Sequence, residues 1–293
     1  MMQRNTSVIN IPPFVEHDLL IKELGFFGKI FLILKGKFLS FIVNRLEGKT
    51  LCMFINLFYG KKGKVYFENS KYYKSINNSK FYYPNKRFLR IVNDEDILRK
   101  IIVESYCLDS IKFNENDIIL DCGANVGELN LALNQYDKKL EYHAFEPDED
   151  AYGCLELNFE EAKDNFQNIG LSDTNSKRPL YLDGSGGNSS FVDFGSNKEI
   201  VVESITLDSL NFSNTIKLFK VDAEGFEPEV LLGSINTLPL INYISVDFGS
   251  ERGIEQSNTV TEVNKFLYDN DFNLIDFSNF RTVGLYKNNN IKE

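Results

Sequence analysis

Residues 118–133 read IILDCGANVGELNLAL. Three apolar residues end in an acid, a glycine-containing segment follows, and apolar residues at helical spacing come next. This order predicts a strand, a tight loop and a helix, which together begin a βαβ unit. Gly123 and Gly127 let the backbone turn sharply and approach a ligand, while the following helix offers unpaired N–H groups and the positive end of its dipole. Asp121 ends the strand, at the edge where open α/β sheets bind ligands.

The glycine spacing and two acids indicate which ligand this loop binds. A dinucleotide loop has the pattern G-x-G-x-x-G, whereas Gly123 and Gly127 give G-x-x-x-G, and Asp121 before them would repel a pyrophosphate. An acid in this position suits the ammonium, sulfonium and ribose groups of S-adenosylmethionine. Glu146 ends a second predicted strand, 141–146, and is placed to accept hydrogen bonds from both ribose hydroxyls.

Composition describes an ordinary globular protein of 293 residues, long enough for one large domain and an N-terminal appendage. The four cysteines show no C-x-x-C pair and no zinc-ligand spacing, which favours a reduced, cytoplasmic setting. Lysines interrupt the apolar stretch 25–43 too often for a membrane span or a secretory signal. We therefore expect a cytoplasmic protein.

Charge divides the chain into two regions. Residues 1–100 contain 18 Lys and Arg against 8 Asp and Glu, a net charge of +10. Because the whole chain has a net charge of −10, the remaining residues have a net charge of −20. We expect a basic appendage over 1–90, helical at first and then made of short strands, followed by a catalytic domain over 91–293. The appendage helix either docks on its own domain, which is the favoured interpretation, or makes peripheral contact with an anionic membrane. The acidic catalytic region disfavours nucleic acid as a partner, and the oligomeric state is open.

Further segments have weaker signals. Aromatic residues and turn signals predict short strands over 64–92, and an apolar period predicts a helix over 94–108. The segment 168–173 is interpreted as a third short strand that ends in Ser172 and Asp173, suited to an adenine edge, although Ser-Asp is also a routine turn. The glycine-rich loop 183–190 is either a lid over the substrate or a solvated connection.

A second informative stretch is 216–227, IKLFKVDAEGFE. Strand alternation puts Lys220 and Asp222 on one face. A lysine is costly in a central parallel strand, so its spacing from Asp222 suggests an ion pair at the ligand edge of the sheet. The alternative is an ordinary salt bridge at a strand end, and the neighbouring acids favour an active site.

These motifs together resemble the FkbM family of S-adenosylmethionine-dependent methyltransferases over about residues 90–290. The motifs are the Asp121-x-Gly123-Ala124-Asn125-x-Gly127 loop, Phe145-Glu146-Pro147, Ser172-Asp173 and Lys220-x-Asp222-x-Glu224-Gly225-Phe226-Glu227. The resemblance implies the α/β class I methyltransferase fold, a Rossmann-like seven-stranded mixed sheet flanked by helices. It also implies O-methylation of a hydroxyl on a glycan or polyketide-type acceptor.

The resemblance further implies roles for single residues. Asp121, Gly123 and Asn125 would line the methionine end of S-adenosyl-L-methionine and Glu146 its ribose, while Asp222 and Glu224 would face the transferred methyl group. The chain departs from the family at Asp247, which ends a predicted strand where the family more often has Glu.

Methyl transfer to a hydroxyl requires aligned reactants and removal of the hydroxyl proton. Neither histidine is a good candidate base, since His17 lies in the appendage and His143 within the second predicted strand. The remaining candidates are Asp222, Glu224, Asp247 or a Lys220 of depressed pKa. We expect no metal, because no strict ligand spacing is visible. A non-catalytic binding module on the same fold and a nicotinamide-dependent oxidoreductase are the alternative functions.

Overall fold

The structure, a computed structural model, describes residues 25–59, 64–76, 79–90, 95–183, 189–278 and 281–291. The chain divides into two compact units, residues 1–98 and 99–293. Three features of the sequence lie outside the described residues. They are His17, a turn signal at Asn77-Asn78 and the centre of the glycine-rich loop, 184–188.

The first unit consists of two helices and a three-stranded antiparallel sheet of order β1-β2-β3. Its elements are α1 (Phe26–Arg45), α2 (Gly48–Tyr59), β1 (Lys64–Glu68), β2 (Lys71–Ile76), β3 (Ser79–Tyr83) and the 3-10 helix η2 (Lys86–Arg90). The Asn56 side chain joins α2 to β1, because its amide donates to the carbonyl of Val65 at 2.8 Å and its oxygen accepts from the N–H of Val65 at 2.9 Å. The hydroxyl of Tyr72 in β2 accepts from the N–H of Gly48, the first residue of α2, at 2.8 Å.

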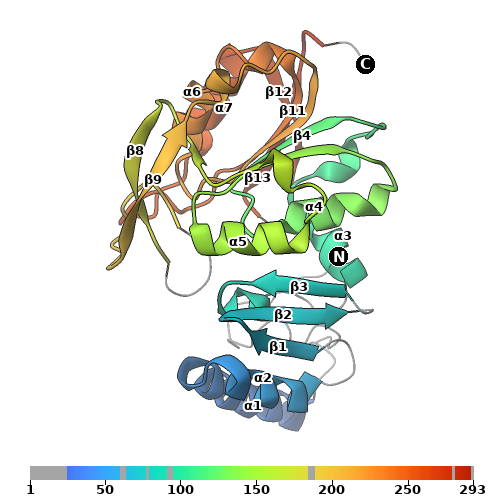
Figure 1. Cartoon of the computed structure of the whole chain (residues 1–293), viewed down its shortest axis with the longest axis vertical. Helices are drawn as coiled ribbons and strands as arrows, with labels where there is room; N and C mark the ends of the chain where they lie inside the picture. Colours follow the sequence, from blue (N-terminus) through green and yellow to red (C-terminus); the bar gives the residue numbers. More distant parts are fainter. Residues whose placement is uncertain are drawn as a thin grey trace. The chain divides into compact units, whose positions relative to one another are not determined.

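The second unit contains a seven-stranded mixed sheet. Helices connect the strands along the chain and flank the sheet (Figure 1). Its strands are β4 (Ile118–Cys122), β5 (Glu141–Phe145), β6 (Phe166–Gln167), β10 (Ile216–Val221), β11 (Ile241–Asp247), β12 (Phe272–Phe277) and β13 (Val283–Asn288). Its helices are α3 (Glu95–Ser105, which begins in the first unit), α4 (Glu128–Leu133), α5 (Glu149–Asn158), α6 (Glu227–Leu232) and α7 (Val260–Asp269). Short 3-10 helices are η3 (Leu108–Ser110), η4 (Asn134–Tyr136), η5 (Lys163–Asn165), η6 (Leu207–Leu210) and η7 (Leu238–Leu240).

The strand order is β12-β13-β11-β10-β4-β5-β6. Strands β4, β5, β6, β10 and β11 pair in parallel, while β13 runs antiparallel to both β11 and β12. Because parallel crossovers are right-handed, α4 and α5 cover one face of the sheet, and α6 and α7, which lead in the opposite direction, cover the other. The seven-stranded mixed class I methyltransferase sheet expected from the sequence is therefore confirmed.

The strand expected over 168–173 is present but short, and it belongs to another sheet. The third strand on the β5 side of the sheet is β6, not the segment 168–173. That segment instead contributes β7 (Gly170–Leu171) to a separate three-stranded sheet of order β7-β9-β8, with β8 (Ser176–Tyr181) and β9 (Glu199–Ile205). Only glycine fits at position 170, because the ring of Phe191 lies 2.3 Å from the position that a Cβ on Gly170 would occupy.

The central strands of the large sheet are mostly apolar and contain a buried ion pair between β4 and β10. Strands β4 and β10 are buried at every position, as central parallel strands are. In the register of these two strands Lys220 stands opposite Asp121, and the Lys220 Nζ lies 2.9 Å from the Asp121 Oδ1. The same ammonium also donates to the carbonyls of Cys122 at 3.0 Å and Gly123 at 2.8 Å. The lysine is therefore matched by an acid and by two backbone acceptors at the point where β4 leads into its loop.

Replacing Lys220 with methionine should destabilise the protein by about 3–5 kcal/mol, because it leaves the Asp121 carboxylate buried without its counter-ion. The free energy of unfolding, measured in urea, tests this. Lys177→Met is the matched control, since Lys177 is 71% exposed and its pair with Glu203 lies on the surface; it should change stability by less than about 1 kcal/mol. Equal, small losses in both variants would contradict a structural role for the buried pair.

Candidate active site

The β4–α4 loop lies tightly against the ends of the neighbouring strands. Gly123, Asn125 and Gly127 all have a left-handed backbone, with φ of +72°, +50° and +88°. The N–H of Gly123 donates to the carbonyl of Phe145, at the end of β5, at 3.0 Å. A Cβ on Gly123 would stand 2.0 Å from the carbonyl oxygen of Asp222, so only glycine fits between β5 and β10 here. The loop therefore depends on both predicted glycines.

Asp121 lies beneath this loop and is fully buried. One carboxylate oxygen pairs with Lys220, and the other accepts a hydrogen bond from the Tyr142 hydroxyl. Burial alone would lower the pKa of Lys220, but the charges around it, Asp121 first, raise that pKa above its usual range. A raised pKa favours the protonated lysine and argues against the alternative of a depressed-pKa lysine base.

Glu146 follows β5 and holds the same loop from the other side. One of its carboxylate oxygens accepts from the N–H of Asn125 at 2.7 Å, and the other accepts from the N–H of Asp148 at 2.9 Å. The side chain is buried, and this burial raises its pKa to about 7. Asn125 also presents its side-chain Oδ1 without a hydrogen-bond donor among the residues that the structure describes, although the atom is shielded from solvent. These groups can accept hydrogen bonds from a polar ligand.

A carboxylate cluster follows the ends of β10 and β11. It consists of Asp222, Glu224, Asp247 and Glu251. Arg281 joins two of its members, because its guanidinium donates to Asp222 at 3.3 Å and forms an ion pair with Asp247. Burial and the Asp222 charge raise the pKa of Asp247 to about 7 although Arg281 opposes them.

Tyr106 completes the contacts of Asp222. Its hydroxyl donates to the Asp222 Oδ2 at 2.6 Å and accepts from Arg281 at 2.9 Å. Lys220 lies 3.8 Å from the same oxygen. The Asp222 side chain, only 10% exposed, is thus contacted by one hydroxyl and two cations.

Residues 222–227 form a loop that a buried acid holds in place. One oxygen of Glu227 accepts from the N–H groups of Ala223 at 3.2 Å and Gly225 at 2.9 Å, and the other accepts from the Thr259 hydroxyl at 2.9 Å. The backbone is left-handed at Glu224 and Gly225. A Cβ on Gly225 would meet the backbone of Arg252 at 2.6 Å. The acid-glycine pattern after β10 therefore fixes the direction in which Asp222 and Glu224 leave the sheet.

Three of the acids could hold a cation. Asp222, Glu224 and Glu251 each offer a carboxylate oxygen, and these oxygens lie within 4.8 Å of one another. Hard divalent cations such as Mg²⁺ prefer oxygen ligands of this kind. Burial and the Asp222 charge raise the pKa of Glu224, and a proton shared with Glu251 would relieve the same repulsion without a metal.

Ser172 and Asp173 form a turn whose side chains bond to each other and to Arg178. The Asp173 carboxylate accepts from Ser172 at 2.9 Å and from Arg178 in β8 at 3.0 Å. A Cβ on Gly233, which follows α6, would stand 1.8 Å from the Ser172 carbonyl oxygen, so this turn packs closely against the end of α6. Among the described residues, no hydrogen bond joins the two side chains to Asp121, Asn125 or Glu146.

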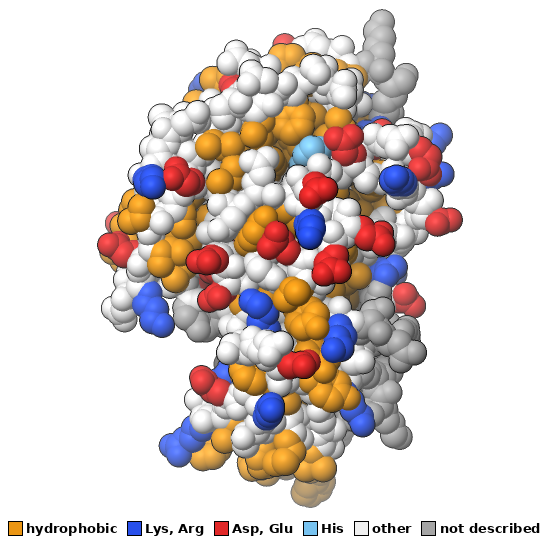
Figure 2. Space-filling view, in the orientation of Figure 1, with side chains coloured by type: hydrophobic (Ala, Val, Ile, Leu, Met, Phe, Trp, Pro, Cys, Tyr) orange, Lys and Arg blue, Asp and Glu red, His pale blue; other side chains and the backbone are white. Residues whose placement is uncertain are grey.

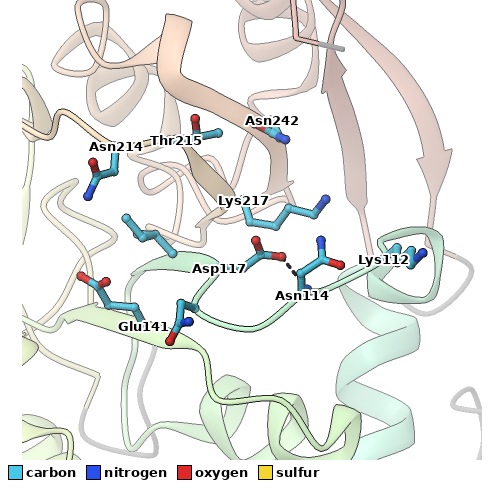
Figure 3. Close-up of a pocket in the computed structure, with 10 residues that line it drawn as sticks. Lys112, Asn114, Asp117, Glu141, Asn214, Thr215, Lys217 and Asn242 are labelled. Carbon is cyan, nitrogen blue, oxygen red and sulfur yellow. Dashed lines mark hydrogen bonds between the residues drawn. The ribbon is translucent and has the colours of Figure 1, made fainter. Parts of the chain in front are cut away.

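A hollow at the opposite edge of the sheet is a separate feature. Asp117, Glu141 and Lys217 line it from the amino ends of β4, β5 and β10 (Figure 3). Ligands of open α/β sheets bind at the carboxyl ends of the strands. The Asp121, Glu146 and Asp222 groups, which lie at that edge, are therefore the better candidate site.

Sequence reasoning missed Tyr106, Arg281 and Glu251. The apolar pattern of residues 94–108 included Tyr106 as one of several apolar residues, and the residue directly follows α3 in the structure. Arg281 precedes the last strand and has no motif around it. Only the excess of acids over cations near Asp222 could have suggested that a cation from elsewhere is needed.

Several known proteins are similar to this chain. The chain is 25% identical over 194 residues to the hexuronic acid methyltransferase AglP of Haloferax volcanii, covering 61% of this chain and 75% of that protein. Solved structures similar to it include an S-adenosylmethionine-dependent methyltransferase from Aquifex aeolicus, at 13% identity, 66% and 97% coverage and a TM-score of 0.39. Another is the fibrillarin pre-rRNA processing protein of Methanococcus jannaschii, at 13% identity, 78% and 98% coverage and a TM-score of 0.39.

The family signature covers more than half of the chain. Residues 121–274, which begin at Asp121 and include the loop, Glu146 and the Asp222 segment, match the methyltransferase FkbM domain. The chain therefore belongs to the FkbM methyltransferase family, and its cofactor is S-adenosyl-L-methionine.

Proposed function

We propose that the protein transfers the methyl group to a hydroxyl of a glycan, and that Asp222 accepts the hydroxyl proton. The observation that carries this proposal is the position of Asp222, whose carbonyl oxygen packs against Gly123 of the cofactor loop while its carboxylate is held by Tyr106 and Arg281. The name of the Haloferax relative, a hexuronic acid methyltransferase, supports a sugar acceptor.

The residues proposed to bind the cofactor lie in the β4–α4 loop and directly after β5. Asp121, Gly123, Asn125 and Gly127 would hold the methionine end, and Glu146 would accept hydrogen bonds from the ribose hydroxyls. The unpartnered Oδ1 of Asn125 and the close backbone approach at Gly123 fit such a ligand. When bound, the cofactor supplies an electrophilic methyl group on a sulfonium. Ser172 and Asp173 stay assigned to the adenine end as a prediction, which has no support from their observed contacts.

The cofactor affinity should depend on the charge of Glu146. Because burial raises the Glu146 pKa to about 7, the carboxyl is largely protonated below that pH and accepts hydrogen bonds less well. The affinity for S-adenosylhomocysteine should rise about tenfold as the pH rises through about 7, which corresponds to about 1–2 kcal/mol. Calorimetric titration across this range measures it.

A variant separates this effect from other titrations. Glu146→Gln should bind the product weakly with a flat pH profile, whereas Glu203→Gln, on exposed β9, should follow the wild type. Stability of the free protein should change in the opposite direction. A raised carboxyl pKa contributes stability at low pH that is lost as the pH rises through about 7. An unchanged pH profile in Glu146→Gln would contradict the ribose assignment.

The base assignment predicts a split between folding and turnover. Asp222→Asn keeps the size of the side chain, so cofactor affinity should stay close to that of the wild type while turnover falls about 10²- to 10⁴-fold. Glu224→Gln is the informative comparison, because its acid is two residues away in the same loop and has a raised pKa. If Glu224→Gln loses more activity than Asp222→Asn, Glu224 is the base.

The acceptor is tested with uronic-acid-containing and neutral oligosaccharides and labelled S-adenosylmethionine. A methyl ether on a hydroxyl resists mild alkali, whereas a methyl ester on a uronic acid carboxyl is released by it. We expect an alkali-stable product. Alkali-labile label would place the methyl group on the carboxyl, and cofactor binding without label on any saccharide would contradict the glycan class.

We also expect turnover to survive chelation by EDTA. Loss of turnover that Mg²⁺ restores would assign a cation to the Asp222, Glu224 and Glu251 carboxylates.

A further inference from the structure

Helix α1 exposes a stripe of large apolar side chains. Phe27, Phe31, Leu34, Phe38 and Phe41 are 84%, 68%, 60%, 51% and 55% exposed. Their spacing of four and three residues keeps them on one face of the helix. We call this set the α1 apolar face. Figure 2 shows hydrophobic side chains gathered over α1 and α2 at the lower end of the view, with basic side chains around them.

This exposure is unusual for a helix that is otherwise anchored. Gly36, on the opposite side of α1, and Ile42, beside the apolar face, are buried, and the carbonyl of Val43 accepts a hydrogen bond from Lys86 at 2.8 Å. The helix thus packs through part of its circumference while the side chains of the α1 apolar face stay more than half exposed. The sequence favoured a helix that docks on its own domain. Such docking accounts for the buried residues of α1 but not for its exposed phenylalanines. Contiguous exposed apolar faces of this kind mark interaction sites.

Charge around the α1 apolar face is predominantly positive. Lys29, Lys37, Arg45 and Lys49 are exposed on α1 and at the start of α2, and the guanidinium of Arg45 lies 4.4 Å from the ring centre of Phe41. Over residues 25–59 there are five Lys and Arg against a single acid, Glu47. A complementary partner is therefore apolar where it meets the phenylalanines and negatively charged beside them.

We propose that α1 lies in the surface of an anionic lipid bilayer, with its apolar face inserted among the acyl chains and its basic residues at the head groups. Large apolar side chains on one face of a helix, with basic residues beside them, allow the helix to lie in the membrane interface. No helix of the described segments is long and apolar enough to cross a membrane, so α1 would lie along the surface.

A second copy of the chain is the less suitable partner. Two α1 helices packed face to face would bring Lys29, Lys37 and Arg45 of each copy together, with only Glu47 to oppose them. Exposed Phe26 and Ile30 also widen the apolar arc beyond the narrow seam of a two-helix contact. Anionic lipid provides both the apolar depth and the negative charge.

Co-sedimentation of the full chain with vesicles tests the proposal. The protein should bind phosphatidylcholine vesicles containing phosphatidylglycerol at least about tenfold more tightly than vesicles of phosphatidylcholine alone, and added salt should weaken this binding. Phe31→Ser/Phe38→Ser should reduce binding to the anionic vesicles about tenfold or more. Val201→Ser/Tyr268→Ser is the matched control, because it removes two exposed apolar side chains from β9 and α7, and it should bind as the wild type does.

Two further measurements make the result decisive. Both double variants should keep wild-type circular dichroism and S-adenosylhomocysteine affinity, since the altered side chains are exposed. Light scattering should give the same mass for the wild type and Phe31→Ser/Phe38→Ser. Absence of vesicle binding by the folded wild type, equal loss in both double variants, or a dimer that only Phe31→Ser/Phe38→Ser abolishes would overturn the proposal. None of these outcomes bears on methyl transfer, which is measured separately.

Discussion

The buried pair of Lys220 and Asp121 is the constraint on which the site depends. Strands β4 and β10 are the central neighbours of the sheet, and a charge in either would be costly without its partner. The Lys220 ammonium also holds the carbonyls of Cys122 and Gly123, so it fixes the first residues of the cofactor loop. One side chain thus joins sheet stability to loop geometry.

The loop and the carboxylate cluster are coupled through backbone as well as charge. Gly123 packs against the Asp222 carbonyl, and the N–H of Asp222 donates to the Cys122 carbonyl at 3.2 Å. A shift of the β4 loop would therefore move Asp222 and, with it, the contacts to Tyr106 and Arg281. The loop proposed to bind the cofactor and the acid proposed as base thus belong to one rigid unit, as an in-line displacement requires.

Local patterns sufficed for the parts of the fold that are encoded locally. The alternation from apolar strand to acid and glycine placed the ends of β4, β5 and β10 correctly, since each strand ends within a few residues of its signal. The partner of Lys220 was less accessible. Sequence proximity favoured Asp222, whereas parallel register puts Asp121 directly opposite, and the distances of 2.9 Å and 3.8 Å follow that register. Tyr106 and Arg281 come together only through tertiary folding.

The basic first unit follows the same logic of charge. An acidic catalytic unit is repelled by an anionic surface, so an enzyme whose acceptor is attached to such a surface needs a separate cationic element to approach it. Helix α1 has the required composition, whereas no role in methyl transfer needs exposed phenylalanines. Separation of the two functions would let the carboxylates around Asp222 keep the negative field that favours a cationic cofactor, while the lysines beside the α1 apolar face supply the attraction that the catalytic unit lacks.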